Sequence, residues 1–464
     1  YFNSLVEAIG DGLRRARHDL IAVIHEDVLL PEYWQPHFEG SLSRLEAHDP
    51  DWGMVGSVGW DASNNLVGHW SDPHGYGERL PDVHGFGEVF RLDEQLLVFH
   101  RARLPELDAD IPGIHHLGHH LAMQLRVREM KTYAIDAPTI HKYADGSGRL
   151  IKTIADSGKI MDRRSLTYLA DRACCNEYMK HLWPNATIED YREPILKWPV
   201  TQDKERQLEE PIVLVSRGGS GSRLLSAMVL DAGIHLVGTL NVSGDTMDMV
   251  LPVYQGLVEK YQCKAEWQKA QTVPRIRAAA ARVIAELPPH QPWGFKLPET
   301  LLLLPEIISA FPRARFVHLL RDPIATCLRR THQSARLDNH IGRIALPLAY
   351  DAMGIERKTI LTHSPAHHMA YTTIHQLGNV YTFRERLDTR SFFECRFEDL
   401  LVQPEGETER LCQWLGTAPT GSRLPALLDS DRAKNPKVQY PDETVREIEE
   451  ILRPLRTLLG YAKT

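Results

Sequence analysis

The sequence lacks the segments that mark a membrane or secreted protein. It contains no run of about 18 uninterrupted apolar residues, the length that a membrane-spanning helix requires. It also has no charged and then apolar stretch of the kind that directs secretion. We therefore expect a protein that spans no membrane.

Cysteine is scarce as well, with six residues in a chain of 464. Two of them are adjacent, at Cys174 and Cys175, and the others are scattered. This pattern fits neither a zinc site nor the disulfide framework of a small secreted domain. Because unpaired cysteines are typical of a reducing compartment, we expect a cytoplasmic protein.

An excess of positive charge is also missing. The chain has 54 Lys and Arg residues against 61 Asp and Glu residues, for a formal net charge of −7. We therefore expect no nucleic-acid partner, and a cationic site confined to a local cleft for an anionic ligand. The composition, 43% hydrophobic and 25% charged, is that of a globular protein, and the length corresponds to about two or three domains.

The most informative segment present covers residues 211–225, with the sequence PIVLVSRGGSGSRLL. An apolar run breaks into glycines and serines and then into a helical pattern, the layout that directs backbone N–H groups at a phosphate. A nucleoside-triphosphatase loop needs a lysine, and none occurs between Gly218 and Leu225. The glycine spacing does not match the dinucleotide pattern GxGxxG either. The segment predicts a phosphate loop of another class, with an ordinary glycine turn as the alternative.

A second buried-strand pattern, ARFVHLLRDP over residues 314–323, ends in an arginine. It places the Arg321 guanidinium at the carboxyl end of a strand, where open α/β sheets bind their ligands. Together the two segments predict a site for both anionic ends of one nucleotide.

These two segments resemble motifs of the sulfotransferases that use 3′-phosphoadenosine 5′-phosphosulfate (PAPS). Residues 220–225, SGSRLL, resemble the loop that binds the 5′-phosphosulfate, and Arg321-Asp322-Pro323 resembles the start of the 3′-phosphate motif. Further stretches follow in the order of that family: 293–298 (WGFKLP), 311–316 (FPRARF), 396–400 (RFEDL) and 412–416 (CQWLG). The resemblance covers about residues 211–461. It implies a P-loop-like α/β fold, a parallel sheet flanked by helices, with PAPS as the donor.

The chain departs from that family at two positions of the donor site. Gly219 stands where the family usually has Arg or Lys, and the nearest cations are Arg217 and Arg223. Arg329 stands where the family has a serine, eight positions after the motif arginine. Since an arginine binds phosphate at least as well as a hydroxyl does, we expect an altered donor site that still binds. The expected donor-binding residues are Arg217, Gly218, Gly219, Ser220, Gly221, Ser222, Arg223, Arg321 and Arg329.

Sulfuryl transfer requires cations on the moving group and a base for the acceptor proton. We expect Arg217 and Lys296 to supply the positive charge, and Asp245 to act as the base. The next candidates for the base are Asp248 and Glu299. The alternative for Asp245 is a structural one, in which it only caps the helix that follows it.

A different motif lies near the beginning of the chain. An apolar strand pattern over residues 20–24 ends in His25, Glu26 and Asp27, and acidic residues at a strand end form a cation site. This phrase resembles the Asp-x-Asp-like motif of inverting glycosyltransferases of the GT-A type, and the resemblance covers about residues 1–150. It implies an α/β unit that holds Mn or Mg against a sugar nucleotide, with the metal ligands His25, Asp27 and His141.

This amino-terminal unit looks incomplete by the standard of that family. Only about one helix precedes the metal motif, so the nucleoside-binding strands are missing. The acceptor segment has His119 and His120 near the place of the expected catalytic Asp. A histidine can act as a base near neutral pH, or it can join a transition-metal site. The alternatives are a structural or acceptor-binding unit, an active glycosyltransferase, and a separate metal site.

We therefore expect a GT-A-like unit over residues 1–197, a linker over 198–210 and a sulfotransferase unit over 211–464. The expected activity transfers a sulfuryl group from PAPS to a hydroxyl acceptor. A carbohydrate acceptor is the simplest expectation, because of the association with a glycosyltransferase-like unit. The rival functions are a metal-dependent glycosyltransferase, a bifunctional enzyme, and a non-catalytic protein that binds a nucleotide or glycan. The acceptor and the oligomeric state stay open.

Overall fold

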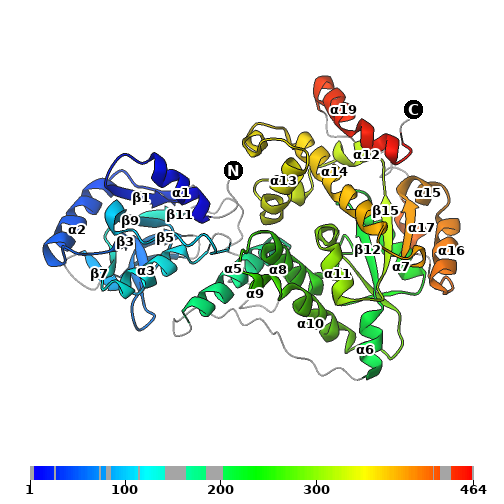
Figure 1. The fold of residues 1–464 in the computed structure, drawn as a ribbon, viewed down its shortest axis with the longest axis horizontal. Coiled ribbons are helices and arrows are strands. Elements are labelled where there is room, and N and C mark those ends of the chain that lie inside the picture. The colour runs from blue at the N-terminus through cyan, green and yellow to red at the C-terminus, as the bar shows by residue number, and fades with distance from the viewer. Residues whose placement is uncertain are drawn as a thin grey trace. The chain divides into compact units, whose positions relative to one another are not determined.

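The computed structural model describes residues 5–25, 28–72, 75–79, 85–112, 115–141, 163–183, 202–421, 423–428 and 440–461. It divides into an amino-terminal unit, Phe2–Arg192, and a carboxyl-terminal unit, Glu193–Thr464 (Figure 1). All six cysteines are buried free thiols. Within the described residues, no helix combines the length and the apolar character that crossing a membrane requires.

A five-stranded parallel sheet forms the centre of the carboxyl-terminal unit, in the strand order β13-β14-β12-β15-β16. The central strand β12 is buried along its whole length, so its sequence reads as a continuous apolar run. The expected parallel sheet is confirmed. Its strands are β12 (Ile212–Ser216), β13 (His235–Leu236), β14 (Trp293–Lys296), β15 (Arg315–Leu320) and β16 (Phe392–Arg396).

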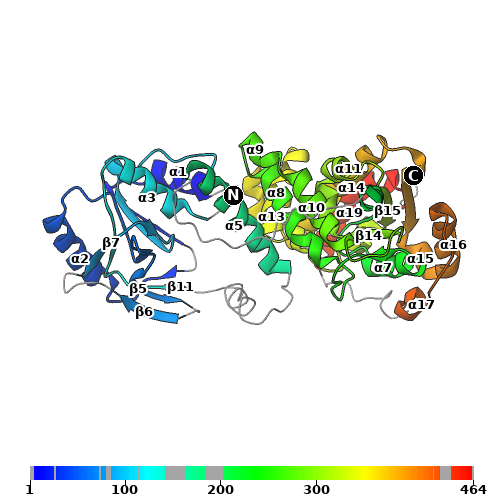
Figure 2. The same cartoon turned by 90° about the horizontal axis from the view of Figure 1, so that it is seen from below.

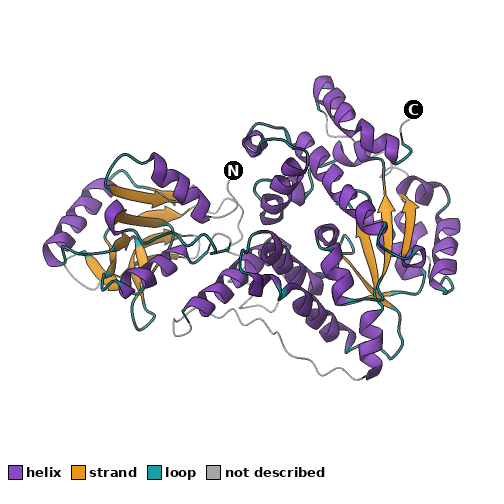
Figure 3. Ribbon diagram, in the orientation of Figure 1, coloured by secondary structure: helices purple, strands orange, loops and turns teal. Residues whose placement is uncertain are grey.

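Helices cover both faces of this sheet (Figure 3). On one face, α7 (Ser222–Asp231) and α16 (Pro404–Leu415) pack against apolar side chains of β12 and β15. On the other face, α14 (Pro365–Arg384) places Phe383 edge-on to Phe316 of β15, with 5.1 Å between the ring centroids. The expected helical flanks are therefore also present.

The remaining helices of this unit lie along the chain between and after these elements. The α-helices are α6 (Gln202–Glu209), α8 (Val250–Tyr261), α9 (Glu266–Lys269), α10 (Thr272–Ile284), α11 (Leu304–Ala310), α12 (Pro323–Cys327), α13 (His340–Ala352), α15 (Phe397–Val402), α17 (Arg423–Leu427) and α19 (Asp442–Leu458). The 3-10 helices are η2 (Met247–Met249), η3 (Pro298–Leu302), η4 (Gln333–Ala335), η5 (Arg357–Leu361) and η6 (Thr389–Ser391).

The neighbouring strands β12 and β15 continue in opposite directions across the sheet. The chain passes from β12 through α7 to β13 on one side, and from β15 to β16 on the other. Ser216 and Leu319 are paired in the parallel register, so the loops that follow both strands begin at the same edge. Such a switch point is where open α/β sheets bind ligands, and it brings Arg217 and Arg321 to one region.

The segment 198–210 differs from the expected linker, because it contains helix α6. Leu208 of this helix is buried, and Lys204 donates from Nζ to the Ile284 carbonyl oxygen at 2.8 Å. Gln207 donates to the Gln291 carbonyl oxygen at 2.9 Å. The polar side chains that suggested a linker therefore cap the end of a neighbouring helix and dock α6 on the carboxyl-terminal unit.

The amino-terminal unit contains two mixed sheets, in the orders β1-β9-β3-β10-β7 and β2-β11-β5-β4-β8, with β6 beside β5. Figure 2 labels β5, β6, β7 and β11 of these sheets. Among the strands that the structure describes in this unit, the pairs β3–β10 and β5–β11 are parallel and the other pairs are antiparallel. The expected strand 20–24 is present as β1. The strands are β1 (Leu20–Ile24), β2 (Val28–Leu29), β3 (Met54–Gly56), β4 (Val58–Trp60), β5 (Leu66–Asp72), β6 (Gly75–Arg79), β7 (Phe86–Val89), β8 (Arg91–Leu92), β9 (Leu96–His100), β10 (Thr132–Ile135) and β11 (Thr139–His141).

The described helices of this unit are α1 (Leu5–Arg15), the 3-10 helix η1 (Arg101–Arg103), α2 (Trp34–His48), α3 (Leu117–Val127) and α5 (Arg163–Leu182). The helix α2 packs its apolar side against Trp52 and the strands of the first sheet. The unit therefore has a core of its own, consistent with an independent α/β unit.

Candidate donor-binding and catalytic site

The loop between β12 and α7 presents a row of unused backbone donors. Gly219 and Gly221 have φ angles of 95° and 97°, in the left-handed region that glycine tolerates. The Ser220 amide donates to the Arg217 carbonyl oxygen at 3.0 Å and tightens the turn. Among the described residues, the amides of Gly219, Gly221, Ser222 and Arg223 have no such acceptor. Alternating backbone conformations at a helix N-terminus form a concave anion site.

Two of the loop glycines are needed because aromatic rings lie against them. A Cβ atom at Gly218 would lie 2.1 Å from Cδ2 of His332, and one at Gly221 would lie 2.4 Å from Cε2 of Phe397. Both separations are far below a van der Waals contact, so any larger residue would displace the loop. The loop is held between an imidazole and a phenyl ring.

Ser220 adds a hydroxyl donor to this loop. Its side chain is buried, and Oγ has no hydrogen-bond partner among the described residues. An unsatisfied buried hydroxyl is costly unless a ligand or water pairs with it. The hydroxyl is therefore available for an anion held by the loop.

Lys296, at the end of β14, reaches the same loop from the neighbouring strand. It is fully buried, and Nζ lies 3.0 Å from Ser222 Oγ and 2.8 Å from Asp245 Oδ1. Asp245 also accepts through Oδ2 from Asn241 Nδ2 at 3.0 Å. The two catalytic candidates Lys296 and Asp245 are thus brought together as a buried ion pair beside the first residue of α7.

The structural alternative for Asp245 does not hold. The next helix, η2, has Thr246 at its N-cap and no side-chain capping bond. Asp248, the second candidate base, accepts from the Thr239 amide at 2.8 Å and so stabilises a local turn. Asp245 is therefore the acidic residue of this segment that contacts the loop lysine.

Arg217 lies at the site, but its guanidinium donates hydrogen bonds to side chains of the protein itself. Its guanidinium donates to Thr372 Oγ1 at 2.8 Å and Thr373 Oγ1 at 3.3 Å in α14, and to Ser334 Oγ at 3.1 Å. Burial lowers its pKa to about 10, and no carboxylate of the described residues forms an ion pair with it. The structure thus places a buried positive charge under the loop, where we expected a direct donor contact.

Arg321 follows β15 as the sequence predicts. Its side chain is 9% exposed and lies over the Phe397 ring, with Cζ 4.1 Å from the ring centroid. Burial lowers its pKa, while Glu398 and Asp322 oppose this shift. Its Nε has no hydrogen-bond partner among the described residues. A stacked guanidinium with an unused donor is suited to a phosphate.

Two further arginines lie on or beside the loop. Arg329 is half-buried and approaches the Gly219 carbonyl oxygen through Nη1 at 3.5 Å. Arg223, in the first turn of α7, is half-buried and makes no ion pair with the described residues. The expected donor-binding residues 218–223 therefore form one loop, and Arg329 approaches that loop in space. Arg321 begins the neighbouring loop, after β15.

His332 is a site residue that the sequence analysis missed. It contacts Gly218, accepts or donates through Nδ1 with Ser334 Oγ at 3.0 Å, and places Nε2 4.0 Å from Glu299 Oε1. Glu299 also accepts from Gln333 Nε2 at 3.0 Å. His332 lies in a polar stretch of sequence without periodicity, so no local pattern predicted it. Only its packing against Gly218 in the structure identifies it as a site residue. His332 and Glu299 form a second acid–base pair at the loop.

The expected metal site of the amino-terminal unit cannot be assembled from the described residues. Asp27 lies outside them, as does the side chain of His141, and the His25 amide donates to the Gln95 carbonyl oxygen at 3.4 Å. Within the described ranges, no three His, Cys, Asp or Glu side chains are grouped to hold a metal ion. The metal site stays a prediction.

The proposed histidine base of that unit has an unsuitable environment. Burial lowers the pKa of His119 to about 3, with His116 and Arg91 adding to the effect. His120 is buried too, and its Nδ1 accepts from Trp183 Nε1 at 3.2 Å. The near-neutral pKa expected for a base at this place is therefore wrong for His119.

Comparison with known proteins bears on the carboxyl-terminal unit. Residues 211–420, which are 210 of the 464, match the family model described as the sulfotransferase family. An omega-hydroxy-beta-dihydromenaquinone-9 sulfotransferase, Stf3, of Mycobacterium bovis is 31% identical over 121 residues, which are 26% of this chain and 28% of the relative. The protein of the same name from Mycobacterium tuberculosis matches to the same extent. The match thus spans about a quarter of the length of these relatives.

Solved sulfotransferase structures resemble the chain more distantly. Sulfotransferase STF9 of Mycobacterium avium has 13% identity and a TM-score of 0.37, with coverage of 63% of this chain and 83% of that chain. A sulfotransferase of Alicyclobacillus acidocaldarius has 12% identity and a TM-score of 0.35, with coverage of 55% and 97%. The match to the family model begins at residue 211, so the glycosyltransferase resemblance of the amino-terminal unit stays a prediction. Over residues 211–420 the chain is therefore similar to the sulfotransferase family.

Proposed function

We propose that the carboxyl-terminal unit transfers a sulfuryl group from PAPS to a hydroxyl acceptor. The observation that carries the proposal is the pair of anion sites at the ends of β12 and β15. One site is the loop with its unused amides, and the other is the stacked Arg321 guanidinium with an unused Nε. Two anion sites at one switch point suit a nucleotide with phosphates on two sides of its ribose.

In this proposal the loop amides and Ser220 Oγ hold the 5′-phosphosulfate. Arg321 binds the 3′-phosphate, with Arg329 beside it in place of the family serine. Arg217 contributes its buried charge from below the loop, without a direct contact to the donor. An electrostatic cradle that exists before the donor binds needs little reorganisation when charge develops in the transition state.

The chemistry is an in-line displacement at sulfur. The acceptor oxygen attacks the sulfur while the bond to the bridging phosphate oxygen breaks, and the acceptor proton passes to a base. Lys296 and Ser222, which lie 3.0 Å apart at the start of α7, are placed to stabilise negative charge on the leaving side. Asp245 keeps Lys296 in this position through their ion pair.

Two groups compete for the role of the base. Asp245 is our first candidate, but its carboxylate already forms an ion pair with Lys296. The pair of His332 and Glu299 is the second, since an imidazole beside a carboxylate commonly accepts a proton near neutral pH. Turnover retained by the Asp245 variant described in the Discussion would exclude Asp245 as the base and leave the pair of His332 and Glu299.

We propose a wider class of acceptor than the carbohydrate that we first expected. The name of the mycobacterial relative specifies a hydroxylated menaquinone as its substrate. For this chain we propose an alcohol acceptor, and a screen should include hydroxylated isoprenoid quinones together with glycans.

The first test is calorimetric titration with 3′-phosphoadenosine 5′-phosphate (PAP), the desulfated donor. Adenosine diphosphate (ADP) is the control, because it carries two phosphates but none at the 3′ position. We expect PAP to bind at least about tenfold more tightly, since a charged hydrogen bond to Arg321 contributes about 1.5 kcal/mol or more. Equal affinity for PAP and ADP, or no binding of either, would reject the proposed donor.

A further inference from the structure

The carboxyl-terminal helix α19 lies outside the family match but contacts the donor motifs. The match ends at residue 420, and α19 covers Asp442–Leu458. Its buried residues Ile448, Leu452 and Leu455 share one apolar core with α12 and α14. The helix therefore packs beside the loop that follows β15, where Arg321 lies.

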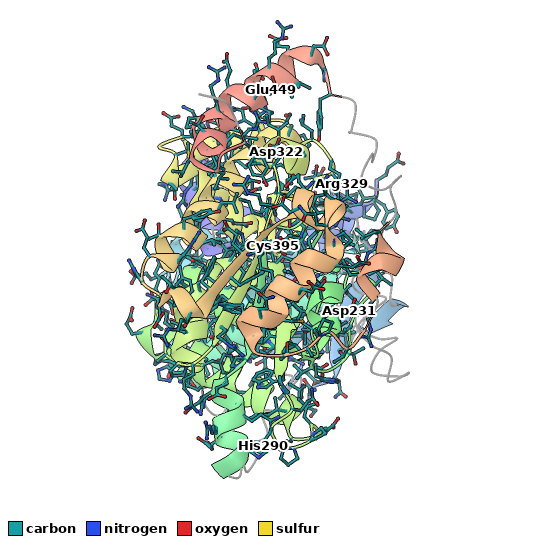
Figure 4. The ribbon with its side chains drawn as sticks, turned by 90° about the vertical axis from the view of Figure 1, so that its right-hand side faces the viewer. Asp231, His290, Asp322, Arg329, Cys395 and Glu449 are labelled. Atoms are coloured by element: carbon teal, nitrogen blue, oxygen red, sulfur yellow. The ribbon has the colours of Figure 1, made fainter. Side chains whose placement is uncertain are left out.

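Arg456 of this helix forms an ion pair with Asp322, the residue that follows Arg321. Its Nε lies 3.0 Å from Asp322 Oδ1, and its Nη2 lies 3.0 Å from Asp322 Oδ2. Figure 4 shows Asp322 below the red helix, on which Glu449 is labelled. Such a two-pronged contact fixes the orientation of the carboxylate as well as its position. The same carboxylate caps α12 by accepting from the Ile324 amide at 3.0 Å.

Tyr461, just beyond α19, hydrogen-bonds to Glu398, which follows Phe397 in the chain. Its hydroxyl donates to Glu398 Oε2 at 2.8 Å, and Glu398 Oε1 accepts from the Asp322 amide at 3.1 Å. Arg396 donates to the Leu459 carbonyl oxygen at 2.7 Å. The segment 396–398 is therefore tied to the carboxyl-terminal residues on both sides of Phe397.

Arg321 depends on both of these anchored neighbours. Its backbone is continuous with Asp322, which Arg456 holds, and its guanidinium lies on Phe397, between the anchored Arg396 and Glu398. A long arginine side chain loses entropy when it is fixed on a ligand, and preorganisation reduces that cost. The contacts of α19 thus restrict Arg321 before any ligand arrives.

We propose that Arg456 and Tyr461 are positioning residues that orient Arg321 toward the 3′-phosphate of the nucleotide. They thereby set the selectivity of the site for nucleotides with a 3′-phosphate over those without one. This inference rests on the proposed function, because it assumes that Arg321 binds the 3′-phosphate.

A simpler effect of charge has to be separated from positioning. Arg456 is a cation, so its loss could weaken an anion site without any change in geometry. Asp322→Asn reverses this expectation, because it removes a negative charge while Asn still caps α12. Charge alone predicts tighter PAP binding by this variant, whereas positioning predicts weaker binding.

The experiment measures Kd for PAP and for ADP by calorimetry on the full chain. We expect Arg456→Ala and Asp322→Asn to weaken PAP binding by about tenfold, and to change ADP binding by less than about twofold. Tyr461→Phe, which changes no charge, should weaken PAP binding by about threefold. The matched control is Arg453→Ala, which removes an exposed arginine of the same helix and should leave both affinities unchanged.

Each result decides between the explanations. A wild-type protein that does not prefer PAP would reject the proposed function itself. A wild-type protein that does prefer PAP, with variants that keep the same ratio of PAP to ADP affinity, would overturn only the inference. Equal weakening of both ligands would show a merely structural role and would also overturn it. Should Arg456→Ala unfold, Tyr461→Phe and Asp322→Asn carry the decision.

Discussion

Lys296 and Asp245 form a buried ion pair, so a substitution of either one also affects folding. Removing one partner leaves an uncompensated charge in the interior, which costs about 3 kcal/mol or more. Neither residue is close to the other in the sequence, yet both were expected from the family resemblance. What the sequence did not predict is that they bind each other, because a contact between a loop and a strand end depends on the sheet order.

We predict that Asp245→Asn lowers kcat by about 100-fold or more and leaves the Kd for PAP within about twofold, because it removes the base while Lys296 keeps its charge. Single-turnover rates with PAPS and calorimetry with PAP measure the two quantities. Asp351→Asn, at an exposed ion pair with Arg357, is the control for a loss of one carboxylate. Retention of most of the turnover by Asp245→Asn would instead point to His332.

The loop from β12 to α7 is the element on which donor binding depends, and its glycines serve different purposes. Gly219 is required by its φ angle, because an added Cβ would make only an ordinary contact, 3.8 Å from Cγ2 of Thr326. Gly218 is required by its neighbour His332. The pattern of glycines and serines was sufficient to predict the loop. Its two ring contacts were not predictable, because His332 and Phe397 come from distant parts of the chain.

We predict that Gly218→Ala destabilises the protein by about 1 to 3 kcal/mol and abolishes measurable PAP binding, because the added Cβ overlaps the His332 ring. Gly378→Ala is the matched control. This exposed glycine lies inside α14 with nothing within 4 Å of an added Cβ, so alanine should stabilise the protein by about 0.5 to 1 kcal/mol. Chemical unfolding of both variants tests the pair, and a stable, PAP-binding Gly218→Ala protein would contradict the proposed loop packing.

On the scale of the whole molecule, the two units differ in how well the sequence predicted them. The parallel sheet and the donor loop of the carboxyl-terminal unit follow from patterns within single segments. The amino-terminal unit contains its expected strand β1, but its proposed metal ligand Asp27 lies outside the described residues. Its described histidines His119 and His120 are buried, and the burial of His119 makes the stability of this unit depend on pH.

We predict that stability falls as the pH drops below about 6.5, in part through His119. Burial first, and then His116 and Arg91, lower its pKa to about 3 in the folded protein. Between these values the unfolded chain binds the proton and the folded protein does not, so the contribution decreases by about 1.4 kcal/mol per pH unit. The contribution of Glu94 to stability changes with pH in the opposite direction, because burial raises its pKa to about 8.

The comparison of His119→Gln with the wild-type protein isolates this contribution. Urea midpoints measured at pH 6.5 and pH 5.0 should fall less in the variant, since the glutamine does not titrate. The Glu94 contribution is common to both proteins and cancels in the difference. An identical fall in both proteins would show that His119 is protonated or solvated in the folded state.

The sequence by itself determined the features that depend on neighbouring residues. These are the strand–loop–helix at 211–225, the arginine at the end of β15, and the buried character of the strands, because local periodicity and glycine placement specify them. Only the tertiary structure decided which side chains meet. Arg217 hydrogen-bonds to α14, and His332 packs against Gly218. Arg456 pairs with Asp322, which lies 134 positions earlier in the chain. These contacts depend on how the sheet orders its strands and on which helix covers which face, and no local pattern in the chain carries that information.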